Sequence, residues 1–167
     1  MNPEMNPDLC VPCGDGILNI RAGAIILRDG KVLMAGNERK DYLYSVGGRL
    51  KLGETAAEAV VREVLEETGV RMEVDRLGFL HENYFYGDSP SNFGRLIYEI
   101  SFFFYMKVPE NFEPACGSAT EDGDRERLRW VALDENVELY PAFFKTELQC
   151  PAEGVKHFVT RPGQEKI

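Results

Sequence analysis

The sequence lacks any apolar run as long as a transmembrane helix requires, which is roughly 20 residues. Its longest candidate, Ile100 to Met106, has the length of a buried strand. The N-terminus is acidic and has no apolar core of the kind found in secretion signals. We therefore expect a protein that has no membrane partner and resides in the cytoplasm.

Positive charge is scarce: 19 Lys and Arg residues stand against 28 Asp and Glu residues, which gives a formal net charge of −9. Proteins that bind DNA or RNA normally carry a basic surface, so we expect no nucleic-acid partner. An acidic protein that handles phosphates would bind a small ligand, with metal cations offsetting the like charge. Taken alone, however, the net charge is better explained by solubility.

Cysteine is also sparse. Cys10 and Cys13 have the spacing of half a zinc site, but Cys116 and Cys150 stand alone and supply no second pair. Thiols in the cytosol are generally reduced. The sequence therefore favours free thiols over a zinc or redox site.

The length of the chain suits a single domain. Residues 1–16 are rich in Pro, Asn and Asp and predict a flexible leader, so the folded domain would comprise residues 17–167. Apolar periodicity and turn signals predict strands at 18–27, 31–34, 42–46, 73–80, 96–107, 128–131 and 157–160, and helices at 55–68 and 142–148. This order of elements predicts a mixed sheet with helices packed on it.

The helix predicted over residues 55–68 has clear signals at both ends. Thr55 and Glu58 form a capping box, and Gly69 stands where a glycine commonly ends a helix. An apolar stripe at helical spacing predicts core packing; it consists of Ala57, Val60, Val61, Val64 and Leu65.

The same helix carries an unfavourable acidic cluster. Glu63, Glu66 and Glu67 share one helix face, where like charges repel. They also lie in the last turns, where the helix dipole disfavours negative charge. A bound divalent cation would remove this conflict, and clustered carboxylate oxygens suit Mg²⁺ or Mn²⁺. The alternative is a solvated acidic surface.

The loop that precedes this helix is rich in glycine, which lets a backbone approach a metal or a phosphate closely. Gly47 lies at its start, and Arg49 and Lys51 can contact phosphate oxygens. Arg62 can pair with neighbouring glutamates on the helix or reach back to Glu54, and so hold the loop in place. The alternative for the glycines is an ordinary turn.

The segment from Gly48 to Val70 resembles the Nudix box, whose pattern is G-x5-E-x7-R-E-U-x-E-E-x-G-U with U a bulky aliphatic residue. Every fixed position of the pattern is present. The resemblance implies a Nudix α/β/α sandwich with a mixed β-sheet. It also implies Mg²⁺- or Mn²⁺-dependent hydrolysis of a nucleoside diphosphate linked to another moiety, the substrate classes being ADP-ribose, dinucleoside polyphosphates, nucleotide sugars and nucleoside triphosphates.

The resemblance assigns roles to individual residues. The metal ligands it implies are the carboxylates of Glu63, Glu66 and Glu67 and the carbonyl of Gly47. Glu54 and Arg62 match the pair that braces the loop against the helix, and the fixed glycines Gly48 and Gly69 support the structure. Many members have proline where Val46 stands, a difference that removes no ligand.

The general base is left open by the sequence. It is Glu67 or Glu63 of the box, or Glu99, which interrupts an apolar run that predicts an interior strand. A buried carboxylate is costly unless it is paired or metal-bound. The alternative is that Glu99 lies at an edge or pairs with an arginine. Weaker candidates for the base lie in a polar loop: Glu121, Asp122 and Glu126.

An aromatic segment follows the box and suggests where a nucleobase binds. Tyr84 and Tyr86 could stack on a base, and Tyr86 lies near the marker tyrosine of dinucleoside polyphosphate hydrolases of the family. Core or dimer packing is the alternative. The marker proline of ADP-ribose hydrolases, expected around Phe85, is absent, as is the NADH-hydrolase signature S-Q-P-W-P-F-P.

Two further expectations follow from the resemblance. Homodimers are common in the family, so a homodimer is possible here. A Nudix domain that only senses or binds nucleotides would typically have a damaged box. The box is intact here, so the sequence favours an enzyme with a small nucleotide substrate.

Overall fold

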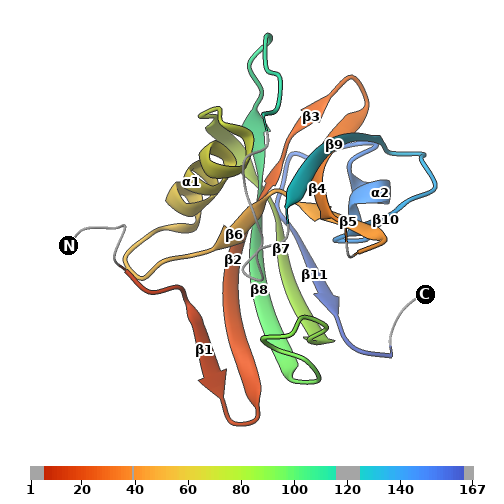
Figure 1. The fold of residues 1–167 in the computed structure, drawn as a ribbon. Coiled ribbons are helices and arrows are strands. Elements are labelled where there is room, and N and C mark those ends of the chain that lie inside the picture. The colour runs from red at the N-terminus through yellow and green to blue at the C-terminus, as the bar shows by residue number, and fades with distance from the viewer. Residues whose placement is uncertain (1–5, 39, 116–124, 164–167) are drawn as a thin grey trace.

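The computed structural model describes residues 6–38, 40–115 and 125–163. In this part of the chain, strands form two mixed β-sheets and two helices pack against them (Figure 1). The helices are α1 (Ala56–Thr68) and α2 (Phe144–Glu147). Neither of these helices has the length and apolar character needed to cross a membrane.

The larger sheet consists of β1 (Cys10–Cys13), β2 (Gly16–Ile25), β6 (Gly47–Arg49), β7 (Glu73–Tyr86), β8 (Leu96–Lys107) and β11 (Lys156–Thr160). Its order is β1-β2-β8-β7-β11, with β6 paired to β2. The pairs β2–β8 and β7–β11 are parallel, and the other pairs are antiparallel. Because β2 and β6 are neighbours, the glycine-rich segment is hydrogen-bonded directly to β2 of this sheet.

The smaller sheet consists of β3 (Leu27–Arg28), β4 (Lys31–Asn37), β5 (Tyr42–Ser45), β9 (Glu126–Ala132) and β10 (Glu138–Tyr140). Its order is β10-β5-β4-β3, with β9 paired to β4. Only the β5–β10 pair is parallel among these described strands. The sequence predicted one mixed sheet, whereas the strands divide between two.

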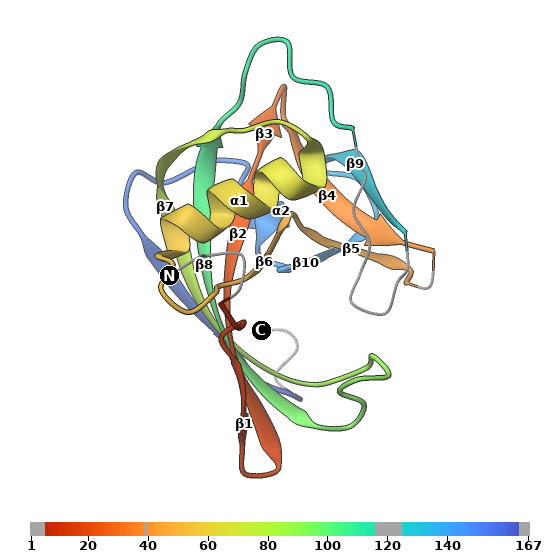
Figure 2. The same cartoon turned by 60° about the vertical axis from the view of Figure 1, so that its left-hand side comes forward.

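Side chains alternate along β8 between the two faces of the larger sheet, as the pleat of a strand requires. Phe104 and Met106 pack in one apolar cluster with Val64 of α1. Phe103 packs in a second cluster with Phe144 of α2. The larger sheet therefore lies between the two helices, with α1 across its near face in Figure 2. This arrangement confirms the predicted α/β/α sandwich.

Two predicted boundaries need correction. β7 does not end near residue 80 but continues to Tyr86, because residues 79–86 pair in register with residues 96–103 of β8. Cross-strand pairing holds this polar and aromatic segment extended, although its own sequence pattern does not alternate clearly. α2 spans residues 144–147, which is shorter than the predicted 142–148.

The segment expected as a leader contains strand β1. Cys10 to Cys13 pair with Gly16 to Asn19 of β2 in an antiparallel hairpin. Just before it, the N–H of Leu9 donates to the carbonyl of Leu50 at 2.7 Å, and Leu9 packs against the cluster under α1. Residues 9–13 are therefore attached to the domain by backbone hydrogen bonds.

Candidate metal centre

Helix α1 begins and ends at residues that fix its position. The hydroxyl of Thr55 accepts a hydrogen bond from the N–H of Glu58 at 3.2 Å, and the N–H of Thr55 donates to Oε2 of Glu58 at 2.8 Å. Gly69 has a left-handed φ of 74°, and its N–H donates to the carbonyl of Leu65. These contacts confirm the predicted caps, and they set the direction of the glutamates in the last turns.

Glu67 points into the protein and is only 6% exposed. Its Oε1 accepts a hydrogen bond from the N–H of Gly47 at 2.8 Å. Its Oε2 is buried and has no hydrogen-bond partner among the described residues. A buried carboxylate oxygen without a partner is costly, so this oxygen needs a proton or a cation beside it.

Burial and the negative charges around Glu67 also favour a proton or a cation beside its carboxylate. Burial raises the pKa of Glu67 to about 8; the hydrogen bond from Gly47 opposes the shift, whereas the charges of Glu126 and Glu63 add to it. Burial also raises the pKa of Glu63. A cation among these carboxylates would favour their charged forms.

The paired glycines let β6 pass between α1 and β2. A Cβ on Gly48 would lie 2.4 Å from Cδ of Glu63. Gly47 has a φ of 143°, and a Cβ there would lie 2.2 Å from the carbonyl oxygen of Ala22. At Gly47 the backbone of β2 excludes any side chain, whereas at Gly48 a side chain would displace the carboxylate of Glu63. The backbone of β6 therefore lies directly against Glu63.

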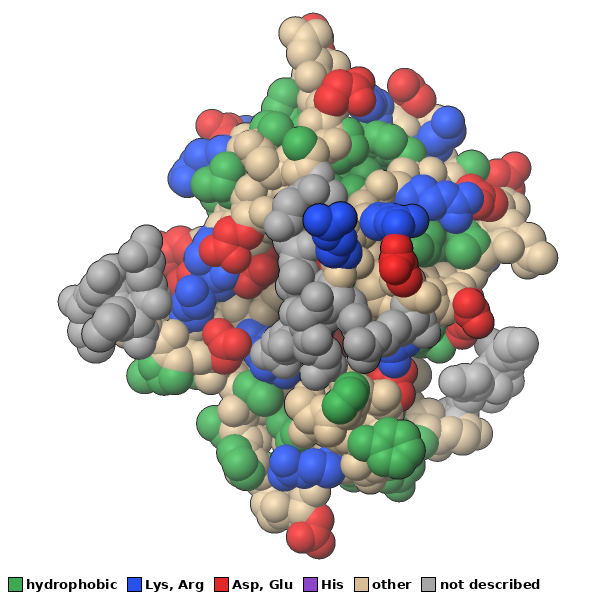
Figure 3. Space-filling view, in the orientation of Figure 1, with side chains coloured by type: hydrophobic (Ala, Val, Ile, Leu, Met, Phe, Trp, Pro, Cys, Tyr) green, Lys and Arg blue, Asp and Glu red, His purple; other side chains and the backbone are tan. Residues whose placement is uncertain are grey.

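The third predicted ligand, Glu66, has a side chain that is 57% exposed and lies 3.7 Å from Nη1 of Arg62. The same nitrogen also pairs with Glu63. The described residues contain no group of three His, Cys, Asp or Glu side chains already arranged to hold a metal ion. Arg62 thus contacts Glu63 and Glu66, whereas Glu67 bonds to the backbone of Gly47, and the three carboxylates are not gathered around one point. Acidic and basic side chains accordingly adjoin over α1 and the segment leading into it (Figure 3).

Arg62 and Glu54 form a two-pronged ion pair, as the resemblance to the Nudix box implies. Nε of Arg62 lies 2.6 Å from Oε1 of Glu54, and Nη2 lies 2.9 Å from Oε2. Nη2 also donates to the carbonyl of Arg49 at 3.1 Å, and the N–H of Lys51 donates to Glu54 at 2.9 Å. The hydrogen bonds from Arg62 lower the pKa of Glu54. This pair therefore fixes the loop against the helix.

Glu99 lies on β8 opposite Asn19 of β2, and its side chain is 14% exposed. Its Oε2 accepts a hydrogen bond from the amide of Asn19 at 2.7 Å, and its Oε1 accepts one from the hydroxyl of Ser101 at 3.2 Å. Nη1 of Arg21 lies 4.0 Å from Oε2. Glu99 is therefore largely buried and, at the same time, near an arginine.

Arg21 is a site residue that the sequence did not indicate. From β2, its Nη2 donates to the carbonyl of Gly47 at 3.1 Å. Burial lowers its pKa, but attraction to Glu99, Glu67 and Glu63 outweighs this and raises it. Arg21 interrupts an apolar strand just as Glu99 does, and this interruption is the sequence feature that could have identified it as a site residue. The pairing of β2 with both β8 and β6, which brings Arg21 to the site, could not be foreseen from one strand.

Comparison with known proteins decides the family. A family model described as the NUDIX domain matches residues 18–148. The chain belongs to the Nudix family. A curated MutT-like protein from Streptomyces ambofaciens is 40% identical over 62 residues, which are 37% of this chain and 40% of that protein. The chain thus spans well under half the length of this relative.

Solved structures show the same Nudix fold. The MutT mutator protein from Bacillus halodurans superimposes with a TM-score of 0.63 at 19% identity, over 88% of this chain and 93% of that chain. An ADP-ribose pyrophosphatase from Streptococcus suis has a TM-score of 0.54 at 18% identity, over 84% of this chain and 98% of that chain. At these identities the similarity concerns the fold alone.

The two residues predicted to contact phosphate in this Nudix domain, Arg49 and Lys51, shortly precede α1 in the sequence. Nε of Arg49 donates to Oδ1 of Asn19 at 3.1 Å, and its Nη1 lies 3.9 Å from Asp8. Arg49 and Glu99 thus share Asn19 as a neighbour. The backbone of Lys51 pairs with Asp8 and supports Glu54.

The tyrosines predicted to contact a nucleobase, Tyr84 and Tyr86, lie at the end of β7. On β7, Asn83 pairs with Glu99 and Tyr84 pairs with Tyr98, so Tyr84 and Tyr86 project from the face of the sheet opposite to Glu99. Tyr84 stacks on Tyr98 with ring centroids 4.3 Å apart. The face that carries these tyrosines is the one that α1 covers further along the sheet, so the register separates the tyrosines from Glu99 and not from the glutamates of α1. The stacking of Tyr84 on Tyr98 favours the packing alternative.

Other residues of the site come from the smaller sheet. The hydroxyl of Tyr44 on β5 donates to Oε1 of Glu126 at 2.7 Å, and the charge of Glu126 acts on Glu67. The weaker base candidate Glu126 therefore lies near the metal centre. Glu121 and Asp122 lie outside the described residues.

His81 lies on the same face as Glu99, since it pairs with Ser101 on β8. It is 5% exposed and its Nε2 lies 2.9 Å from Oγ1 of Thr160. Burial lowers the pKa of His81 to about 4. The imidazole is therefore neutral near pH 7 and links β7 to β11.

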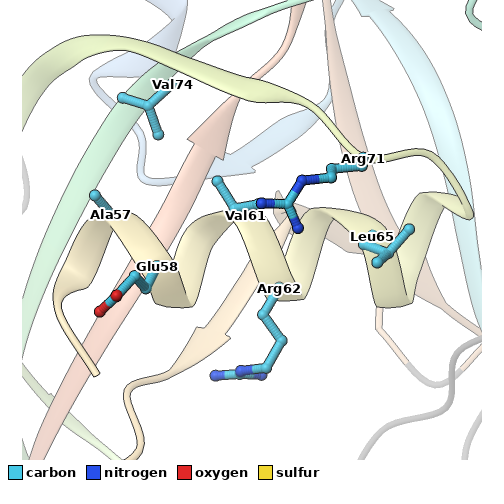
Figure 4. A pocket seen from close by; sticks show the side chains of 7 residues that line it. All are labelled: Ala57, Glu58, Val61, Arg62, Leu65, Arg71 and Val74. Carbon is cyan, nitrogen blue, oxygen red and sulfur yellow. The ribbon is translucent and has the colours of Figure 1, made fainter. Parts of the chain in front are cut away.

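Two further features of the described residues are the pair Cys10 and Cys13 and a pocket beside α1. Cys10 and Cys13 are three residues apart on a strand and so face opposite sides of it, which does not suit one shared metal ion. A pocket of about 540 Å³ lies along α1. Val61, Arg62 and Arg71 are among its lining residues, and Figure 4 shows Arg71 directed toward Val61 while Arg62 leaves the helix in another direction.

Proposed function

We propose that this Nudix protein is a hydrolase that uses Mg²⁺ or Mn²⁺ to cleave a pyrophosphate bond in a nucleoside diphosphate linked to another moiety. The observation that carries the proposal is the buried Oε2 of Glu67, which lacks a hydrogen-bond partner among the described residues. Glu67 lies against Gly47 and near Glu63, so hard oxygen donors surround a place that needs positive charge.

The donor set fits a divalent metal ion. Glu63, Glu66 and Glu67, with the carbonyl of Gly47, would hold it, because Mg²⁺ and Mn²⁺ prefer carboxylate and carbonyl oxygens. When bound, such an ion neutralises the charge that develops on the phosphate oxygens. Arg62 and Glu54 keep the loop against the helix, so that Gly47 and the glutamates stay within reach of one another.

Glu99 is our candidate for the general base. Asn19 and Ser101 each donate to a different oxygen of its carboxylate, which fixes the orientation of the group. A carboxylate held in this way can accept the proton of an attacking water molecule. Glu67 and Glu63 are the alternatives, and both would then be engaged with the metal.

Arg49 and Lys51 are the proposed phosphate contacts, since guanidinium and ammonium groups donate to phosphate oxygens. The substrate classes to test are ADP-ribose, dinucleoside polyphosphates, nucleotide sugars and nucleoside triphosphates. One similar structure is named an ADP-ribose pyrophosphatase, so we propose to test ADP-ribose first.

The test is a hydrolysis assay on the full chain with each substrate class, in Mg²⁺, in Mn²⁺ and in EDTA. Two matched variants are compared with the wild type: Glu67→Gln at the centre, and Glu73→Gln at the far end of β7, where the side chain is 80% exposed. We expect metal-dependent hydrolysis of one class, lost in Glu67→Gln and kept in Glu73→Gln.

Two results would contradict the proposal. Hydrolysis that survives in EDTA or in Glu67→Gln would remove the metal centre from the reaction. Binding of Mn²⁺ and nucleotide without turnover of any class would instead identify a nucleotide sensor.

A further inference from the structure

Arg21 occupies a contact that the proposed metal ion also needs. Its Nη2 donates to the carbonyl of Gly47 at 3.1 Å, and this oxygen is one of the proposed ligands. A guanidinium has only donors, so it satisfies the oxygen as a cation would. A divalent ion on the same carbonyl would lie within a few ångströms of the positive charge of Arg21, and the two would repel.

The surrounding carboxylates explain why an arginine lies there. Glu99 is 4.0 Å from Nη1 of Arg21, and Glu63 and Glu67 also attract it. Together with Arg62, which pairs with Glu63, it offsets the negative charge of the centre. The two arginines therefore offset part of the repulsion between the carboxylates in the absence of a metal ion, while Oε2 of Glu67 stays without a hydrogen-bond partner among the described residues.

The side chain of Arg21 is 35% exposed, and among the described residues it makes one hydrogen bond, to Gly47, and one ion pair, with Glu99. The carboxylate of Glu99, in contrast, is held by Asn19 and Ser101 as well. Arg21 can therefore leave Gly47 without leaving Glu99 unpaired. A planar guanidinium that reaches the surface beside a metal centre is suited to bind a phosphate group with two hydrogen bonds.

We propose that Arg21 is an exchangeable counter-ion of the metal centre, which releases the carbonyl of Gly47 when the metal binds and then contacts the diphosphate of the substrate. This inference depends on the proposed function, because it takes the metal centre as given. This exchange makes metal binding and substrate binding favour each other. The diphosphate stabilises Arg21 away from the carbonyl of Gly47, which is the position that leaves this carbonyl to the metal.

The test measures Mn²⁺ binding to the full chain by electron paramagnetic resonance, without substrate and with the non-hydrolysable diphosphate α,β-methylene-ADP. The variants are Arg21→Gln, Glu67→Gln and the charge control Lys107→Gln, whose side chain is 61% exposed at the distant end of β8. Without the diphosphate, Arg21→Gln should bind Mn²⁺ about tenfold more tightly than the wild type, and Lys107→Gln should match the wild type.

The diphosphate supplies a second readout. It should tighten Mn²⁺ binding to the wild type by at least about fivefold, the lower end of typical coupling between two sites. In Arg21→Gln the tightening should fall below about twofold, because the residue that connects the two ligands is gone.

Each outcome separates the two proposals. If Arg21→Gln binds Mn²⁺ no more tightly than the wild type while Glu67→Gln loses binding, the Arg21 proposal is overturned and the proposed function stands. If Glu67→Gln binds Mn²⁺ normally, the metal centre itself is wrong. Should Arg21→Gln fail to fold, NMR of the arginine Nε–H groups in the wild type replaces it: Mg²⁺ must shift the Arg21 signal, and an unshifted signal overturns the proposal.

Discussion

Replacing Gly48 with alanine should damage the metal centre more than the fold. The added Cβ would lie 2.4 Å from Cδ of Glu63 and 2.5 Å from both of its carboxylate oxygens. Ordinary contacts at such positions lie at 3.4–4 Å, so the carboxylate would have to move by about 1 Å. A displacement of about 1 Å at a catalytic site can lower the rate by roughly 100-fold. We therefore expect Gly48→Ala to lower kcat about 100-fold, with a loss of about 1–3 kcal/mol in the free energy of unfolding.

Gly78→Ala is the matched control. Gly78 lies on β7, and its added Cβ would meet Cε2 of Tyr105, also at 2.4 Å. Tyr105 belongs to the apolar cluster under α2. Both variants should lose similar stability in urea denaturation, but only Gly48→Ala should lose activity and Mn²⁺ affinity. Equal kcat values for the two variants would refute the reasoning, since steric strain alone would then account for both.

Three further predictions follow from the contacts of the site. Arg62→Lys cannot form the two-pronged pair with Glu54, so kcat should fall at least about tenfold, and a value near that of the wild type would contradict the bracing role. Glu99→Gln should lower kcat by more than about tenfold, equivalent to 1.4 kcal/mol, with Mn²⁺ affinity little changed; a smaller effect would leave Glu99 a structural residue. His81 has a folded pKa of about 4 against about 6.5 unfolded, so the unfolded chain takes up its proton first. The free energy of unfolding should therefore fall as pH drops from about 6.5 to 4, by up to about 3 kcal/mol. Urea denaturation should show this fall reduced in His81→Gln and retained in His157→Gln. Equal pH dependence in the wild type and both variants would disprove the prediction.

The sequence was sufficient for everything that local chemistry determines. The caps of α1, the shared face of its glutamates and the pairing of Arg62 with Glu54 all depend on residues within fifteen positions of one another. Spacing along a helix fixes such contacts in advance. The α/β/α layers followed from the resemblance to the Nudix box, and the structure confirms them.

What the sequence could not provide is the contact between distant strands. Arg21 reaches the centre because β2 pairs with β6 and β8 at once. Tyr84 was predicted at the site because it lies in an aromatic segment after the box, but the register of β7 on β8 places it opposite Tyr98, on which its ring stacks. A shift by one residue reverses the face of every side chain on a strand, so no inspection of the aromatic segment itself could decide this.

Strand β1 has a consequence for how this protein can be shortened. The family match begins at residue 18, which invites a truncated protein that starts there. Such a chain would lack the partner of the first residues of β2 and would present an open sheet edge, a known route to aggregation. It would also lose Leu9, whose backbone is bonded to Leu50 in the loop before α1. Residues 9–13 thus connect the loop before α1 with the edge of the larger sheet, and the folded unit of this chain includes residues that precede its family match.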